Sequence, residues 1–247
     1  QDILHQSHTN FELIIVDDGS TDNTKEILEK YSNEERIKIF SKKNGGTGSA
    51  LNLGFENATG KYGTWVSSDD TKDEKFLEKL YNVLTTNRDV EYVFSSFFSS
   101  HLKTNFRPIQ TNVNGGFHFI SSGVCHNNIF TKKVYFLDNW AEYNSIQSFQ
   151  GVCFMFTMNL KNRCGEYIDI PGEDYHMGMK MAFQSRCAYL DEVLGTHENP
   201  LDSLSILDRN CVNEANHITK ALFRERPSHW MLKNIPKVAS FYWGADR

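Results

Sequence analysis

The sequence lacks the features of several large protein classes. None of its five cysteines forms a Cys-x-x-Cys pair, so neither a zinc ribbon nor a thioredoxin-like redox site is expected. No apolar run approaches the ~20 residues that a membrane-spanning helix needs. Basic residues are not in excess, since the formal net charge is -5, and this argues against nucleic acid as the main partner. No internal repeat is visible either.

What is present is the composition of an ordinary globular protein. The 247 residues are 39% hydrophobic and 23% charged, which suits one large α/β domain, with or without a small appendage. The cysteines are widely spaced and odd in number, which favours reduced, partly buried thiols in a cytoplasmic protein. They are Cys125, Cys153, Cys164, Cys187 and Cys211.

The first hundred residues alternate short apolar runs with segments of helical spacing. This alternation is typical of a parallel sheet with helices on both faces. Ligands of such sheets bind beyond the carboxyl ends of the strands. Two adjacent acidic pairs, Asp17-Asp18 and Asp69-Asp70, stand at such ends. The predicted strands are residues 11–16, 36–40, 61–67 and 90–98, and the predicted helices are residues 25–31, 49–58 and 73–86.

The pattern loosens after residue 98. Residues 151–162 predict a single buried strand, and residues 173–184 predict a helix that Glu173 and Asp174 open. Residues 187–199 predict a strand and a loop, and residues 203–220 a helix.

Each acidic pair has two interpretations when it is taken alone. Asp17 and Asp18 lie in "VDDGSTDNT", where a carboxylate can accept a hydrogen bond from a nucleotide base or ribose, or can simply cap a helix. Asp69 and Asp70 in "SSDD" can bind Mg²⁺ or Mn²⁺ together with substrate phosphates, or can favour the start of a helix.

A glycine-rich stretch, "NGGTGSALN", separates the two pairs. Gly46 and Gly48 follow a predicted strand and precede a predicted helix, which permits a nicotinamide-dependent oxidoreductase as an alternative. The third glycine position of that motif is Leu51, and no Lys-Ser/Thr pair follows. The other alternative is a plain glycine-rich turn.

Two later motifs also carry chemistry. In "GEDYHMGMKMA", Glu173 or Asp174 can serve as a general base, with a pKa set by burial and neighbours, or can be a solvated helix cap. His197 in "LGTHENPLDSLS" can ligate a metal or contact phosphate, although a lone histidine more often does neither.

The order of these five motifs resembles the inverting glycosyltransferases of family 2, which have the GT-A fold. The resemblance implies an α/β fold with a mainly parallel (mixed) sheet flanked by helices, over residues 1–205, and a helical extension over residues 206–247. The matching segments are residues 6–24, 44–70, 151–156, 172–175 and 196–205.

The resemblance also implies roles for the acidic residues that follow the first strand and for the glycine-rich stretch. Asp18 matches the carboxylate that reads the nucleotide base, and Asp17 supports its loop. Asn44 and Gly48 fall in the nucleotide-binding stretch, and Asp69 at the ribose or sugar.

Two further roles follow from the same resemblance. Asp70 and His197 match positions that face a divalent cation, Mn²⁺ or Mg²⁺. Asp174 matches the general base, and Glu173 is its neighbour.

The implied reaction moves a sugar from a nucleoside diphosphate sugar, most simply a UDP-sugar, to an acceptor hydroxyl with inversion. The acceptor is a glycan, a lipid-linked sugar or a protein, in the context of polysaccharide biosynthesis. Residues 99–150 then help to form its site, with Trp140 or His126 as lining candidates. A cytoplasmic location is expected, with peripheral association at the inner face of the membrane as a variant. A nucleotide-sugar-binding module without activity is the alternative.

Two departures from the family pattern stand out. The family begins with a strand that ends in a base-contacting motif, and nothing of the kind precedes Gln1. We therefore expect a chain that lacks the usual first strand. An arginine often found before the glycine-rich stretch is replaced by Lys42 and Lys43, which leaves the identity of the base open.

Overall fold

The computed structural model describes residues 2–100, 103–110, 117–121, 134–137, 152–169 and 172–198. Several predictions lie outside these residues. They are the helix over residues 203–220, the extension over residues 206–247, and the acceptor candidates Trp140 and His126.

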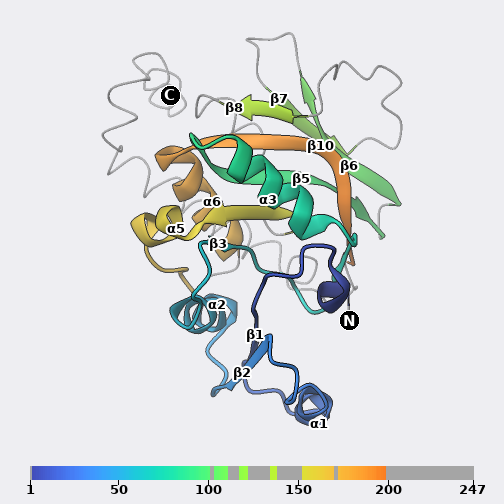
Figure 1. Cartoon of the computed structure of the whole chain (residues 1–247), viewed down its shortest axis with the longest axis vertical. Helices are drawn as coiled ribbons and strands as arrows, with labels where there is room; N and C mark the ends of the chain where they lie inside the picture. Colours follow the sequence, from blue (N-terminus) through green and yellow to red (C-terminus); the bar gives the residue numbers. More distant parts are fainter. Residues whose placement is uncertain are drawn as a thin grey trace, which may run out of the picture.

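The strands form two sheets, a small one and a large one (Figure 1). The small sheet pairs β1 (Leu13–Asp17) with β2 (Ile37–Ser41) in parallel, with Leu13 opposite Ile37. Its apolar residues in β1 are only half-buried, and only the terminal Asp17 is fully buried. Among the described strands β2 is the one neighbour of β1. The absence of a first strand beside β1 stays a prediction.

The large sheet has eight strands and is mixed. Its central order is β3-β9-β5-β10-β4, with β6, β7 and β8 joined at the sides. The pair β5–β10 is parallel, and the other pairs of this sheet are antiparallel. The predicted α/β fold with a mixed sheet flanked by helices is confirmed, but the expected predominance of parallel pairs is not. Among the described strands, only the pairs β1–β2 and β5–β10 are parallel. The strands are β3 (Tyr62–Gly63), β4 (Thr71–Lys72), β5 (Val90–Ser99), β6 (Thr104–Gln110), β7 (Phe117–Ser121), β8 (Val134–Leu137), β9 (Phe154–Thr157) and β10 (Arg186–His197).

The helices follow from apolar residues at helical spacing. Helix α3 places five apolar side chains on one stripe, all of them buried, and lies across β5 and β10 (Figure 1). Such a stripe is what a helix needs to cover one face of a sheet. No helix of the described segments is long and apolar enough to cross a bilayer. The helices are η1 (Asp2–His5), α1 (Thr24–Glu29), α2 (Thr47–Glu56), α3 (Phe76–Thr86), α5 (Met158–Cys164) and α6 (Glu173–Gln184).

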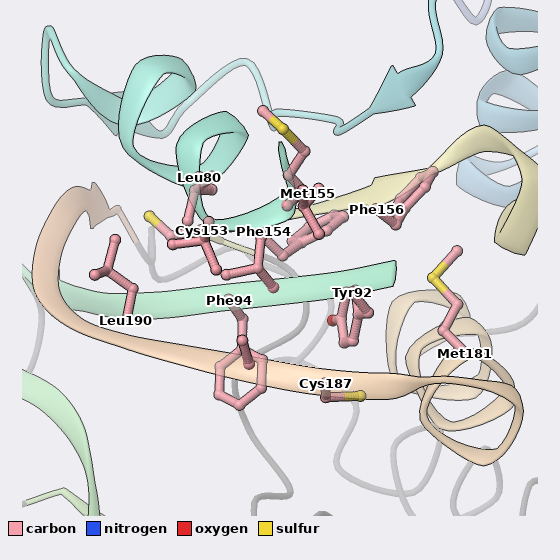
Figure 2. Packing of buried hydrophobic residues seen from close by; sticks show 14 of the residues in the cluster. Leu80, Tyr92, Phe94, Cys153, Phe154, Met155, Phe156, Met181, Cys187 and Leu190 are labelled. Atoms are coloured by element: carbon pink, nitrogen blue, oxygen red, sulfur yellow. The ribbon is translucent and has the colours of Figure 1, made fainter. Parts of the chain in front are cut away.

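The hydrophobic core lies around β5 and β9 in the large sheet (Figure 2). Leu80 of α3 and Phe156 of β9 are 0% exposed, and Tyr92 and Phe94 of β5 are 1% exposed. The ring of Phe94 packs against that of Tyr189 with centroids 5.6 Å apart. Burial of side chains of this size contributes roughly 1.5–3 kcal/mol each, so most of the stability of the described fold resides here.

Two predicted strands are shorter than expected. Residues 61–67 contain only β3 as a strand, and Thr64 instead donates its hydroxyl to the Phe154 carbonyl at 2.6 Å. Residues 151–162 contain β9 and then helix α5, so the prediction of one strand was wrong in its second half. The helix begins there because the Thr157 hydroxyl caps it by accepting a hydrogen bond from the Leu160 amide at 3.2 Å.

Candidate active site

Asp17 is the last residue of strand β1 and Asp18 follows it, so the pair stands at a strand end as predicted from the sequence. Asp17 is buried, and its Oδ1 accepts a hydrogen bond from the Ser20 amide at 2.8 Å. The hydrogen bonds from Ser20 lower the pKa of Asp17. Among the described residues, its Oδ2 is buried without a hydrogen-bond partner. The carboxylate is therefore an ionised anchor for the turn after β1.

Asp18 clamps the glycine-rich loop. It accepts hydrogen bonds from Lys42 Nζ at 2.6 Å, from the Gly45 amide at 3.0 Å and from the Gly46 amide at 2.9 Å. Burial would raise the pKa of Asp18, but the Lys42 ammonium and the two amides outweigh it and lower the pKa. Lys42 is thus the partner of this carboxylate. Base reading by Asp18 stays a prediction.

The glycine-rich loop packs against residues 168–169, which lead to α6. Gly46 has φ of +86°, and a Cβ atom there would overlap the carboxylate of Asp169. A Cβ atom at Gly48 would overlap the Ile168 carbonyl. Both positions therefore require glycine for close approach, and Gly46 also for its backbone conformation. Asn44 is exposed on the same loop.

Helix α2 joins the small sheet to the same segment. Asn52 donates to the Tyr167 carbonyl at 2.8 Å and accepts from the Tyr167 amide at 2.8 Å. The Phe55 ring stacks on the Tyr167 ring at 5.8 Å and contacts Phe156 of β9 at 5.6 Å. The loop after β2 and the segment before α6 are consequently held as one unit.

Glu173 and Asp174 begin helix α6, directly after Gly172, which has φ of +85°. Burial, reinforced by the neighbouring charge of Asp174, raises the pKa of Glu173 to about 7. The charge of Asp174 disfavours ionisation of Glu173, so the Glu173 carboxyl group is partly protonated near neutral pH. A pair of this kind can accept a proton from a substrate hydroxyl. In the next turn, burial lowers the pKa of His176 to about 4.

Asp69 and Asp70 differ sharply in their surroundings. Asp69 is exposed and accepts a hydrogen bond from the Ser67 hydroxyl. The side chain of Asp70 is 1% exposed. Its Oδ1 lies 2.9 Å from Nδ1 of His197 and accepts from the Glu198 amide at 3.3 Å. The hydrogen bond to Asp70 raises the pKa of His197.

The second oxygen of Asp70 is also occupied. Lys72 Nζ lies 3.4 Å from Oδ2 of Asp70. Within the described residues, no three or more His, Cys, Asp or Glu side chains are grouped so as to hold a metal ion. The pair of Asp70 and His197 therefore does not fit a divalent cation as it stands, because a cation at either oxygen has to displace a partner. Their role as metal ligands stays a prediction.

The predicted site residues thus gather into two groups. Asp18 contacts the glycine-rich loop, and that loop reaches the segment before Glu173. Asp70 and His197, 127 residues apart in the sequence, form the second group. Lys72 was missed, although its place two residues after Asp70 would have put both side chains on one side of an extended segment. No sequence pattern pointed to Asp169.

Comparisons with known proteins identify the family and the fold of this chain. The family model for Glycosyl transferase family 2 matches residues 1–160. A protein of Rickettsia felis named as an uncharacterized glycosyltransferase is 37% identical over 118 residues, which is 41% of this chain and 20% of that protein. The chain therefore covers only about a fifth of the length of this relative.

Two solved structures show the same fold. S. aureus TarS 1-349, in complex with UDP-GlcNAc, has a TM-score of 0.65 at 20% identity. The match covers 90% of this chain and 59% of the TarS chain. The mannosyltransferase PcManGT from Pyrobaculum calidifontis, in complex with GDP-Man and Mn²⁺, has a TM-score of 0.59 at 16% identity. The match covers 92% of this chain and 59% of PcManGT. The family match spans both acidic pairs and the glycine-rich loop, and this chain belongs to glycosyl transferase family 2.

Proposed function

We propose that the chain transfers a sugar from a nucleoside diphosphate sugar to an acceptor hydroxyl, with inversion at the anomeric carbon. Asp174 accepts the proton of the acceptor hydroxyl while the acceptor oxygen bonds to the anomeric carbon. On the opposite face, the bond from that carbon to the diphosphate breaks, and the nucleoside diphosphate leaves with the electron pair.

The observation that carries this proposal is the acid pair at the start of α6. Burial and the neighbouring carboxylate raise the pKa of Glu173 to about 7, which is where a proton-transfer site works best near neutral pH. Asp169, which precedes α6 in the sequence, contacts the glycine-rich loop at Gly46. This contact supports a donor bound at that loop on the same side of the fold as the start of α6.

The donor nucleotide is the finer part of the proposal. We take a UDP-sugar as the first donor to test, because S. aureus TarS was solved with UDP-GlcNAc. A GDP-sugar is the matched comparison, because PcManGT was solved with GDP-Man. Asp17, Asn44 and Gly48 lie at or beside the loop that Asp18 and Lys42 close, and Asp69 is the exposed carboxylate of its pair.

The test is a release assay for nucleoside diphosphate with a panel of UDP- and GDP-sugars, run beside calorimetry for donor binding. Asp174→Asn should abolish turnover and leave donor affinity within about twofold, since the amide keeps the shape and loses the proton acceptor. Asp2→Asn, an exposed carboxylate in η1, is the control and should keep full activity.

Two outcomes would count against the proposal. Retained turnover in Asp174→Asn would remove Asp174 as the base. Donor binding by the unaltered chain without any turnover, across donors and acceptors, would favour the inactive binding module instead.

A further inference from the structure

The side chain of Lys72 is enclosed beside Asp70 at the end of the large sheet. Strand β4 pairs with the end of β10, with Lys72 opposite Gly195 and Thr71 opposite Thr196. This short pairing places His197 and Lys72 on either side of Asp70. The side chain of Lys72 is 0% exposed, and that of Asp70 is 1% exposed.

The ammonium group of Lys72 forms its ion pair with Asp70. Its Nζ lies 6.0 Å from the Phe76 ring centroid and 3.4 Å from Asp70 Oδ2. A Cβ atom at Gly195 would lie 3.1 Å from Lys72 Cδ, so the lysine stem packs directly on that glycine. A buried ammonium is costly unless a carboxylate pairs with it. Asp70 supplies that carboxylate.

The pair of Lys72 and Asp70 is neutral, and this changes what Asp70 can bind. A divalent cation on Asp70 would sit next to the buried Lys72 ammonium, where like charges repel strongly. Oδ1 is held by His197 and by the Glu198 amide. Neither oxygen of Asp70 is thus open to a metal ion without losing a partner.

We propose that Lys72 is a built-in counter-ion of Asp70, and that it keeps divalent cations off this carboxylate. Lys72 and Asp70 then form a fixed neutral pair that positions the His197 ring, which is 35% exposed, at the rim of the site. This inference concerns the site of the proposed function, but it is tested on ion binding without donor, so either can fail without the other.

The experiment measures Mn²⁺ binding to the full chain by the loss of the free-ion signal in electron paramagnetic resonance. Lys72→Met keeps the stem and removes the charge, and it should tighten Mn²⁺ binding by about tenfold or more, because the repelling ammonium is gone. Lys72→Arg keeps the charge and should stay at the affinity of the unaltered chain. Lys75→Met, an exposed lysine three residues on, removes the same net charge and should also change nothing.

A second variant covers the case in which Lys72→Met does not fold. The double variant Lys72→Met with Asp70→Asn removes both buried charges, and its Mn²⁺ affinity should lie within about twofold of the unaltered chain. Unchanged or weaker binding in a folded Lys72→Met chain would overturn the proposal. So would a loss of tenfold or more in the double variant, since Asp70 would then already hold the ion in the unaltered chain.

Discussion

The two sheets of this protein are stabilised in different ways. In the large sheet, eight of the ten residues of β5 are buried, and α3 covers them with a buried apolar stripe. In the small sheet, the apolar residues of β1 are half-buried, and the loops at its end are fixed by Asp18 and the lysine and amides around it. The stability of the small sheet, beside the proposed nucleotide site, therefore depends on polar contacts. The stability of the large sheet depends on apolar burial.

The largest expected effect lies in the core of the large sheet. Leu80→Ala should lower the free energy of unfolding by about 3 kcal/mol, because a side chain that is 0% exposed leaves a cavity that its neighbours fill only in part. Urea unfolding followed by circular dichroism measures this. A loss below about 1 kcal/mol would show that the core is not the main source of stability.

The acid pair gives the next effect, and it depends on pH. The pKa of Glu173 is raised from 4.5 to about 7 in the folded chain, so its contribution to stability is favourable below pH 4.5 and is lost as the pH rises through about 7. Glu173→Gln should therefore raise the free energy of unfolding by about 2 kcal/mol at pH 8 and change little at low pH.

Urea unfolding at pH 4, below the ordinary pKa of the group, and at pH 8, above its raised pKa, tests that prediction. Glu26→Gln, an exposed residue of α1, is the control and should show no difference between the two conditions. A Glu173→Gln chain less stable than the unaltered one at pH 8 would reverse the sign of the proposed charge repulsion.

A smaller loss is expected in the small sheet. Ile15→Ala in β1 should cost about 1 kcal/mol, since its side chain is only half-buried and less apolar area is exposed by the change. Hydrogen exchange of the β1 amides should also be faster than that of the β5 amides. If Ile15→Ala costs as much as Leu80→Ala, the contrast between the two sheets does not hold.

The smallest effect concerns Glu12, which precedes β1. Its carboxylate accepts hydrogen bonds from the Thr59 and Gly60 amides and from Lys38. Burial would raise the pKa of Glu12, but Lys38 and these amides lower it from 4.5 to about 2. The stability it provides is present above pH 4.5 and is lost as the pH falls to about 2.

Glu12→Gln should accordingly cost no more than about 1 kcal/mol at pH 7, because the carboxylate is partly solvated. Thermal unfolding of both chains at pH 7 and pH 3 measures the difference, which should shrink at the lower pH. A difference that grows at pH 3 would contradict the assigned cause.

The sequence predicted the elements whose periodicity is unambiguous. Helix α6 has the predicted bounds, because Glu173 and Asp174 mark its start and its apolar residues recur at helical spacing. Strands β1 and β2 were found from short β-branched runs. The joint between β9 and α5 was missed, because one strand was predicted over residues 151–162, although the continuous apolar run ends at Phe156. The helix then begins at the cap formed by Thr157.

The site was predicted in its residues and less well in its contacts. The proximity of His197 to Asp70 followed from the family resemblance and is present in the structure. The contact of Lys42 with Asp18 could not be predicted, since the two residues are distant in the sequence and meet only in the folded chain. Lys72, two residues after Asp70, could have been found from the spacing of an extended segment. Burial decides whether a carboxylate is accessible to a ligand, and a short sequence motif does not predict burial.

The contact of Gly46 and Gly48 with residues 168–169 has a consequence for engineering this protein. A side chain introduced at Gly46 would overlap the Asp169 carboxylate, and one at Gly48 would overlap the Ile168 carbonyl. Either change to the proposed donor pocket would therefore disturb the segment that leads into α6. Donor preference and turnover rate would then change together. A library that seeks a new donor should therefore vary the glycine-rich loop and residues 168–169 as one cassette, because substitutions in one half alone leave the two surfaces mismatched.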